Sequence, residues 1–280
     1  MKRLYSIFSL LIIISKFAMA TTPASEPCPA PPPPTSDEEV NNFRLWGMVI
    51  KMPPVNAPSE KGQQVLHFNT RNKPIEGNPT ALAYAQNEMI NAKVFTSDAD
   101  IMKYAAEEAA KLGNGFLLEF GTKLGKPANF MAALSPKNTV HTFDSLRGLP
   151  EDWREGFPKG TFGYLRNNTF PSLIANAELH KGMFDDSLPK FIEQHIKPSN
   201  RPIAFIHIDC ELYSSTKTVL DFLKDYIKPG TLILFDEYFN FPRWEGYEYR
   251  AFQDFVKNNN IRYEYVAYNG LHEQVLVRII

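Results

Sequence analysis

The sequence predicts an α/β fold in which a mostly parallel sheet carries helices on both faces. From residue 115 onward, short apolar runs alternate with stretches of helical periodicity, which is typical of parallel strands connected by helices. The last two apolar runs flank the turn-forming pair Asn269-Gly270, and this predicts an antiparallel hairpin at the edge of the sheet. A chain of 280 residues is long enough for one such domain.

The first twenty residues are predicted to be a signal peptide. Met1-Lys2-Arg3 gives a positive start, residues 4–17 are mostly apolar, and Ala18-Met19-Ala20 has the small-residue pattern of a cleavage site. The apolar run is shorter than the roughly 20 residues that span a bilayer, and Lys16 interrupts it. We therefore expect a secreted or periplasmic protein without a stable membrane span after cleavage; anchoring through an uncleaved segment is the alternative.

The region between the signal peptide and the main domain is predicted to have two parts. Residues 21–42 form an extended tether, because Pro31 to Pro34 favour polyproline geometry and the small and acidic residues around them offer nothing to bury. Residues 43–94 contain short apolar clusters without a clear period, and we expect an irregular cap there. The main domain then comprises residues 95–280.

Composition and charge give no support for a partner that needs a broad electrostatic surface. Hydrophobic content is 44%, charged content is 22% and the net charge is -1, so the sequence offers no argument for nucleic acid or acidic lipid. Cys28 lies in the tether and Cys210 ends a predicted strand, so no disulfide is expected between them. Any function must come from local sites.

The elements of the main domain follow in order. Ser97 or Asp98 can cap a helix with one apolar face that ends at Gly113. The sequence then predicts strand 116–120, helix 127–134, strand 139–144, a strand near 178–181, helix 187–196, strand 203–209, helix 214–226, strand 231–236, helix 245–258, and the hairpin of 261–268 with 272–280. A parallel sheet that ends in an antiparallel hairpin is the layout of the class I methyltransferases.

The residues after the first two strands are candidates for binding a nucleotide-like cofactor, because open parallel sheets bind ligands beyond the carboxyl ends of their strands. Gly121 and Gly125 would let the turn after the first strand approach a ligand closely. Asp144 ends the second strand, where an acid can accept hydrogen bonds from ribose hydroxyls. The glycine spacing departs from the dinucleotide fingerprint, which disfavours a nicotinamide oxidoreductase and leaves an ordinary strand–helix turn as an alternative.

Acidic residues also end two later strands. Asp209 follows one strand, and Asp236 and Glu237 follow the next. Neighbouring parallel strands would bring these three carboxylates together, where they repel one another unless a cation is present, and all-oxygen ligands suit Mg²⁺. The alternative is that each acid only caps the following helix.

Five longer strings make the sequence similar to a known family. They are FDSLRGLPEDWREGFPKGTF (143–162), GMFDDSLPKF (182–191), HIDCELYSSTKTVL (207–220), FDEYFNFPRWEGYEYRAF (235–252) and YEYVAYNGLHEQVLVRI (263–279). Together they resemble the macrocin O-methyltransferase (TylF-like) family of class I methyltransferases. The resemblance covers roughly residues 95–280, and it implies an enzyme that depends on S-adenosylmethionine and Mg²⁺ and methylates a hydroxyl of a small molecule, with a sugar as the family's expected acceptor.

The resemblance also implies roles for single residues. Those matching the cofactor site are Glu119, Gly121 and Gly125 in the turn, Asp144 and Ser145 at the ribose, and Asp185 and Asp186 near the adenine; those matching the metal ligands are Asp209, Asp236 and Glu237. Leu212 stands where some relatives place a histidine base, so Asp209 becomes the expected catalytic base. His207, on the same strand, is either its partner or a core histidine.

Two further expectations concern the loops and the class of protein. The aromatic residues of the loops are candidates to wall an acceptor pocket: Trp153, Phe157, Phe162, Tyr238 and Trp244. The segment 146–171 is long enough to act as a lid over the cofactor. The competing hypothesis, favoured by the signal peptide, is a secreted binding or effector protein that has a methyltransferase scaffold without the activity.

Overall fold

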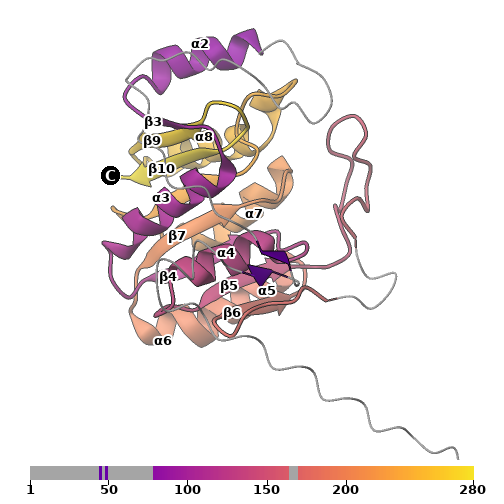
Figure 1. Cartoon of the computed structure of the whole chain (residues 1–280), viewed down its shortest axis with the longest axis vertical. Helices are drawn as coiled ribbons and strands as arrows, with labels where there is room; N and C mark the ends of the chain where they lie inside the picture. The colour runs from indigo at the N-terminus through magenta and orange to yellow at the C-terminus, as the bar shows by residue number, and fades with distance from the viewer. Residues whose placement is uncertain (1–43, 46–47, 50–77, 164–169) are drawn as a thin grey trace, which may run out of the picture.

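The computed structural model describes residues 44–45, 48–49, 78–163 and 170–280 (Figure 1). The predicted signal peptide and tether, most of the residues before 78, and the 164–169 part of the predicted lid lie outside the described residues. In chain order, the elements are β1 (Arg44–Leu45), β2 (Met48–Val49), α2 (Pro79–Glu88), β3 (Lys93–Phe95), α3 (Asp98–Ala110), β4 (Phe116–Phe120), α4 (Lys126–Leu134), β5 (Val140–Asp144), β6 (Ala177–Lys181), α5 (Phe184–Phe191), the π-helix η2 (Ile192–Ile196), α6 (Lys197–Ser199), β7 (Ile203–Ile208), α7 (Tyr213–Leu223), β8 (Leu232–Phe235), the 3₁₀-helix η3 (Trp244–Gly246), α8 (Glu248–Asn258), β9 (Tyr263–Asn269) and β10 (Val275–Ile279).

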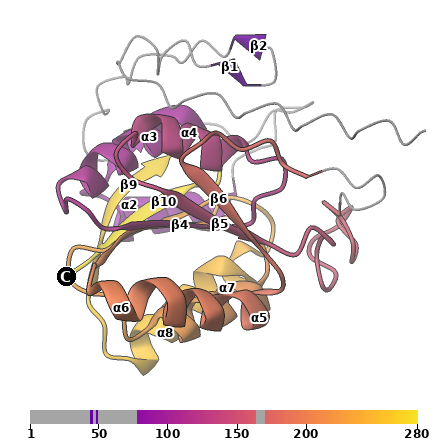
Figure 2. The same cartoon turned by 90° about the horizontal axis from the view of Figure 1, so that it is seen from below.

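The described residues form an eight-stranded sheet with the order β3-β9-β10-β8-β7-β4-β5-β6. Strand β10 is antiparallel to both β8 and β9, whereas the other neighbours pair in parallel. Figure 2 shows α3 and α4 on one face of the sheet and α5, α7 and α8 on the other. The predicted α/β fold is therefore confirmed, including the antiparallel C-terminal hairpin.

Each face of the sheet has its own apolar core, and β4 shows how the sequence divides between them. Phe116, Leu118 and Phe120 belong to the larger core, whereas Leu117 belongs to the core beneath α3 and α4. This alternation follows from the two-residue period of a strand. All five residues of β4 are buried, which explains why the run is apolar throughout and why Glu119 within it must find polar partners.

The cap region contains regular structure that the sequence analysis did not predict. Asn78 caps α2 by accepting a hydrogen bond from the Thr80 amide at 3.1 Å, and proline opens the helix. Ala81, Ala85 and Met89 are buried at spacings of four residues, so the helical period was present, but small alanines made it weak. Strand β3 then pairs in parallel with β9 and extends the main sheet into residues 93–95.

Three tyrosines connect α2 to the main domain. The Tyr84 hydroxyl lies 2.6 Å from that of Tyr265 on β9, which in turn lies 2.7 Å from that of Tyr238 in the loop after β8. Tyr238 is fully buried. A buried tyrosine hydroxyl usually needs a hydrogen-bond partner, and in this chain each hydroxyl finds one in a neighbouring tyrosine.

Two further elements differ from prediction. The helix expected over 187–196 begins at Phe184 and changes at Ile192 into a π-helix; Pro189, which has no amide hydrogen, lies inside it. The hairpin loop is longer than the predicted Asn269-Gly270 turn, since β10 begins only at Val275; the Gly270 amide donates to the backbone oxygen of Phe95 on β3. No helix in the described ranges is long and apolar enough to cross a bilayer.

Candidate active site

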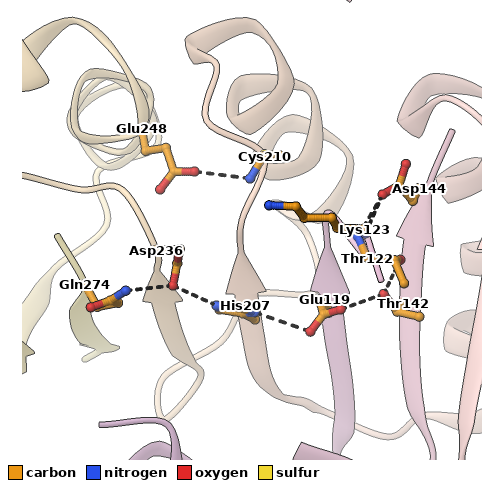
Figure 3. Close-up of polar contacts among 10 residues, drawn as sticks. All are labelled: Glu119, Thr122, Lys123, Thr142, Asp144, His207, Cys210, Asp236, Glu248 and Gln274. Carbon is orange, nitrogen blue, oxygen red and sulfur yellow. Dashed lines mark hydrogen bonds and ion pairs between the residues drawn. The ribbon is translucent and has the colours of Figure 1, made fainter. Parts of the chain in front are cut away.

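The turn after β4 is held by the side chain of Asp144, the last residue of β5. Its Oδ2 accepts hydrogen bonds from the amides of Thr122 and Lys123, both at 2.9 Å (Figure 3). Its Oδ1 accepts one from the Leu146 amide at 2.7 Å. An ionised carboxylate has about four acceptor positions. Three of them are used by the backbone, so about one remains for a ligand.

Gly121 allows the end of β4 to touch the end of β7. A Cβ atom at this position would lie 1.7 Å from the backbone oxygen of Asp209, and the φ of Gly121 is +103°. Both the close approach and the left-handed backbone therefore require glycine. The contact joins the predicted cofactor turn to the loop that carries the predicted catalytic residue.

A pocket of about 600 Å³, open solvent included, lies over these strand ends. It brings together Gly121, Asp144 and Ser145, predicted for the cofactor, with Asp209, predicted for catalysis. The other lining residues are Lys123, Gly148, Leu149, Pro150, Phe162, Gly182, Met183, Phe184, Cys210, Glu211 and Ser215. Carboxylates and apolar side chains together give it the mixed lining of a small-molecule site.

Three carboxylates form a cluster at the β7 and β8 ends, and one of them was not predicted. Asp209, Glu211 and Glu237 each place a ligand atom within 4.8 Å of the others. Burial raises the pKa of Asp209 well above its usual value, and the charge of Asp236 adds to this effect. Burial, followed by neighbouring carboxylates, does the same to Glu211 and Glu237.

The cluster has the chemistry of a cation site. Within the described part of the chain, the buried Oε2 of Glu237 has no hydrogen-bond partner, and buried polar atoms in folded proteins are normally paired. A hard divalent cation such as Mg²⁺ binds oxygen ligands and would offset the mutual repulsion. The donor set formed by Asp209, Glu211 and Glu237 therefore fits such an ion.

Asp236, predicted as a metal ligand, is turned toward other partners. Its Oδ1 accepts a hydrogen bond from the side-chain amide of Gln274 at 3.0 Å and lies 3.7 Å from His207 Nε2. The geometric cluster therefore contains Glu211 beside the predicted Asp209 and Glu237, while Asp236 lies next to it with Oδ1 engaged by Gln274 and His207. Glu211 has a φ of +59°, a left-handed backbone that is uncommon for residues other than glycine. Its position two residues after Asp209 was the available signal.

The buried His207 lies between two carboxylates from neighbouring strands, the buried Glu119 and the partly exposed Asp236. Its Nδ1 lies 3.4 Å from Oε2 of Glu119 on β4, and its Nε2 faces Asp236 after β8 (Figure 3). Burial opposes a charge on His207, but the nearby carboxylates of Asp236 and Glu119 outweigh burial and raise the pKa of His207 to about 10. The same contacts lower the pKa of Asp236 against the effect of burial. His207 is therefore both a core histidine and a partner of the site.

Glu119 lies beneath the pocket rather than in its lining. Its Oε1 accepts a hydrogen bond from the Thr142 hydroxyl at 2.9 Å, and its Oε2 faces His207, so both carboxylate oxygens are engaged within the sheet. The side chain is 2% exposed. The structure therefore shows Glu119 supporting the turn and the strand ends from below.

Glu248, the first residue of α8, connects the two acidic loops and was not predicted. Its Oε1 accepts hydrogen bonds from the amides of Glu211 at 3.1 Å and Cys210 at 3.4 Å, and its Oε2 accepts one from the Glu237 amide at 3.2 Å. The residue is fully buried. A single side chain thus fixes the backbone of the loop after β7 relative to the loop after β8.

The remaining predicted residues divide between the pocket and its surroundings. Ser145 lines the pocket, whereas Gly125 lies outside the lining and caps α4, where a Cβ would meet Leu173 at 2.7 Å. Asp185 and Asp186 are exposed on the first turn of α5, next to lining residues but not among them.

Only one of the five loop aromatics lines the pocket. Phe162 does so, and the ammonium of Lys123 lies 4.2 Å from the centre of its ring. Tyr238 and Trp244 belong to the large core, and Trp153 packs with the partly buried Phe157 beside it. The expected aromatic wall is therefore mostly core packing, because these residues face inward from their loops.

Comparison with known proteins agrees with this architecture. Residues 118–238 match the family described as a methyltransferase domain. The solved structure of CalS11, a calicheamicin methyltransferase, is 20% identical, with coverage of 72% of this chain and 86% of that chain and a TM-score of 0.51. No curated protein matches the sequence.

Two further solved structures share less of the geometry. The O-methyltransferase NovP is 18% identical, covering 64% of this chain and 78% of that chain, with a TM-score of 0.46. An O-methyltransferase from Bacillus cereus in complex with SAH is 18% identical, covering 66% and 82%, with a TM-score of 0.44. The strand order, the antiparallel hairpin and the likeness to CalS11 define the fold as that of the class I methyltransferases. The methyltransferase-domain match covers the strands that carry the site, from β4 to the loop after β8.

Proposed function

We propose that this protein is an S-adenosylmethionine-dependent O-methyltransferase that requires a divalent cation, Mg²⁺ in the first instance. The observation that carries the proposal is the shared pocket, whose lining contains both Asp144 with the Gly121 turn and the carboxylates of Asp209 and Glu211. A methyl donor bound at the turn would face an acceptor held at the carboxylates. The resemblance to the TylF-like family makes a sugar hydroxyl the acceptor class that we propose.

The residues of the turn suit an adenosyl group. Asp144 retains about one free acceptor position for a ribose hydroxyl, and Ser145 lies beside it. Met183 and Phe184 provide apolar surface in the same pocket, where a purine ring could be buried. Lys123 contributes a positive charge between the turn and the carboxylates, and it favours the ionised form of Asp209.

The acidic side of the pocket suits the acceptor. Asp209, Glu211 and Glu237 would hold the cation, which when bound lowers the pKa of a hydroxyl and so makes its oxygen a better nucleophile. Asp209 lies in both the cluster and the pocket lining, and we assign to it the removal of the hydroxyl proton. Glu248 keeps the two acidic loops in register while the acceptor binds.

Calorimetric titration with S-adenosylmethionine, with and without Mg²⁺, tests the proposal first. We expect binding in both conditions, because the turn and the carboxylate cluster are separate groups of residues. Methyl transfer to a panel of nucleotide sugars and glycosides should then require Mg²⁺ and stop in chelator. Failure to bind the cofactor in either condition would favour the alternative, a binding or effector protein built on this scaffold.

We also propose that the protein acts outside the cytosol, because the first twenty residues have the pattern of a signal peptide. Mass spectrometry of the native protein should find a mature N-terminus close to residue 21. An intact Met1 in a membrane fraction would instead support anchoring through an uncleaved segment.

A further inference from the structure

A group of histidines lies at the far edge of the sheet, on strands β5 and β6. His141 of β5 and His180 of β6 have ring centroids 5.2 Å apart, and the ring of His195 on η2 lies 5.5 Å and 5.9 Å from them. None of the three lines the pocket over the strand ends. The proposed methyl transfer makes no use of this group.

Two of these histidines, His141 and His180, form a cluster with the side chain of Glu178 on β6. His141 Nδ1 lies 3.1 Å from His180 Nε2 and 3.7 Å from Oε2 of Glu178, and one ligand atom from each residue lies within 4.8 Å of the others. In tetrahedral zinc sites, bonds of about 2.0 to 2.1 Å place the ligand atoms about 3.3 Å apart. The observed separations therefore need little adjustment to surround a metal ion.

The register of the two strands produces this arrangement. His141 is paired with Glu178, and His180 is paired with Phe143, two residues further along on the same face. The backbone positions of all three residues are thus fixed by a parallel ladder rather than by a loop. Phe143 and Phe191 pack against the imidazoles, with ring centroids 4.7 to 4.9 Å from them. The rings are therefore held in place on their apolar side, as a preorganised site requires.

The site is accessible and its donors are suitable. Histidine nitrogens and a glutamate oxygen are all common ligands of Zn²⁺ in proteins. The Glu178 side chain is 55% exposed, which leaves a route for an ion from solvent. A hydrogen bond between the two histidines is the competing explanation of their 3.1 Å separation, and it leaves no clear role for the nearby carboxylate.

We propose that His141, Glu178 and His180 form a second metal site, selective for Zn²⁺ or a similar transition metal. Two imidazoles and a carboxylate suit such ions, whereas the all-oxygen cluster at the pocket suits Mg²⁺. The ion would connect the edge strand β6 to β5 and stabilise the side of the sheet from which Gly182, Met183 and Phe184 reach the pocket.

Titration of the intact chain with Co²⁺ tests this site, because tetrahedral Co²⁺ with nitrogen ligands absorbs visible light far more strongly than octahedral Co²⁺ with oxygen ligands. We expect one strongly absorbing ion per chain, displaced by Zn²⁺. The absorption should persist in Asp209→Asn, which disrupts the pocket cluster. Equal loss of the signal in that variant would place the ion at the pocket and overturn the proposal.

Two substitutions and one matched control complete the test. Glu178→Gln, at a largely exposed side chain, and His180→Gln should each weaken Zn²⁺ binding more than tenfold, since even the loss of an outer partner of a metal ligand costs about 10- to 100-fold. Glu193→Gln, an exposed glutamate on η2, should leave binding unchanged. Unchanged Zn²⁺ affinity in Glu178→Gln and His180→Gln, or no intense absorption in the parent, would overturn the metal site. The 3.1 Å separation of His141 and His180 would then be a hydrogen bond between the two side chains.

Discussion

Asp144 lines the same pocket as Asp209 and Glu211 of the carboxylate cluster, but the surroundings of the two sets of carboxylates differ. The carboxylate of Asp144 accepts hydrogen bonds from three backbone amides. In contrast, Asp209, Glu211 and Glu237 lie close together, and their pKa values are raised. The unpartnered Oε2 of Glu237, within the described residues, belongs to the second group. The backbone supplies the hydrogen-bond partners of Asp144, whereas the mutual repulsion in the cluster is the reason that we propose a cation there.

The first and largest effect should come from the glycine that joins the two sides. Gly121→Ala would place a Cβ 1.7 Å from the Asp209 backbone oxygen, so the strand ends must separate, and we expect a loss of at least about 4 kcal/mol in the free energy of unfolding. Denaturant unfolding measures it. Gly156→Ala is the matched control, since its φ is +86° but nothing lies within 4 Å; it should cost about 1 kcal/mol. Equal losses would show that the contact is unimportant.

The second effect concerns Glu248, which fixes the cluster from below. Glu248→Ala leaves three amides without an acceptor, and we expect a cost of about 3 kcal/mol together with weaker Mg²⁺ binding. Affinity for S-adenosylmethionine should change little, because Glu248 touches neither Gly121 nor Asp144. The exposed Glu245, whose carboxylate accepts only a surface bond from Thr80, serves as the control. A variant that loses stability but binds Mg²⁺ like the parent would limit Glu248 to a folding role.

The third effect separates Asp236 from the cluster. Asp236→Asn removes the charge opposite the buried His207, and breaking one partner of a buried ion pair costs about 3 kcal/mol. Because the folded pKa of His207 is raised to about 10, its stabilisation is complete below the unfolded value near 6.5 and is lost as pH rises toward 10. The difference in melting temperature between parent and variant should therefore shrink above pH 7. If the variant had the same melting temperature as the parent at pH 6, Asp236 would not be a stabilising partner of His207, and its assignment as a metal ligand would be favoured.

The fourth effect tests the role of Asp144 in cofactor binding. Asp144→Ala should weaken S-adenosylmethionine binding by about 1.5 kcal/mol, the lower part of the range for hydrogen bonds to a charged group, because about one acceptor position is free. It should also loosen the turn. Asp185→Ala, at an exposed residue beside the pocket, should have a much smaller effect on binding. If calorimetry found the two variants equal, the ribose assignment of Asp144 would be wrong.

The smallest effect has the opposite sign. Glu237→Gln relieves repulsion in the cation-free protein, so it should leave stability unchanged or raise it by less than about 1 kcal/mol, while abolishing Mg²⁺-dependent activity. In the parent, the carboxylates of Glu211 and Glu237 have higher pKa values in the folded than in the unfolded chain. They therefore do not reduce the free energy of unfolding below about pH 4.5, and they reduce it increasingly as the pH rises through their pKa values in the folded chain. Added Mg²⁺ should therefore stabilise the parent more at pH 8 than at pH 5, and the variant much less at either pH. Equal stabilisation of parent and variant by Mg²⁺ would count against the cluster.

The sequence predicted the elements with strong periodicity and the residues at strand ends. Strand 116–120 was placed correctly to the residue, and Asp144 and Asp209 do meet at one pocket, because strand ends in a parallel sheet converge whatever their loops do. The sequence did not predict that Asp236 would contact His207 and Gln274, or that Glu211 would lie in the carboxylate cluster. Those outcomes depend on pairs of side chains from different strands and on a left-handed residue, neither of which has a local sequence pattern.

The helix at residues 79–88 was missed for a different reason. Its buried positions are mostly alanines, which bury little surface and give a weak period, and its stability comes from Tyr84 and the tyrosines of the main domain. Elements that depend on tertiary contacts in this way are the ones that sequence patterns underestimate.

Strand β3 has a practical consequence for anyone who shortens this chain. A protein that starts at residue 95 would lose most of β3 and all of α2, and β9 would become the edge of the sheet with unpaired backbone groups over residues 267–269. It would also expose the Tyr265 hydroxyl that Tyr84 covers. Bare strand edges next to aromatic surface are templates for intermolecular pairing. Shortened forms should therefore begin before Asn78 if they are to remain monodisperse.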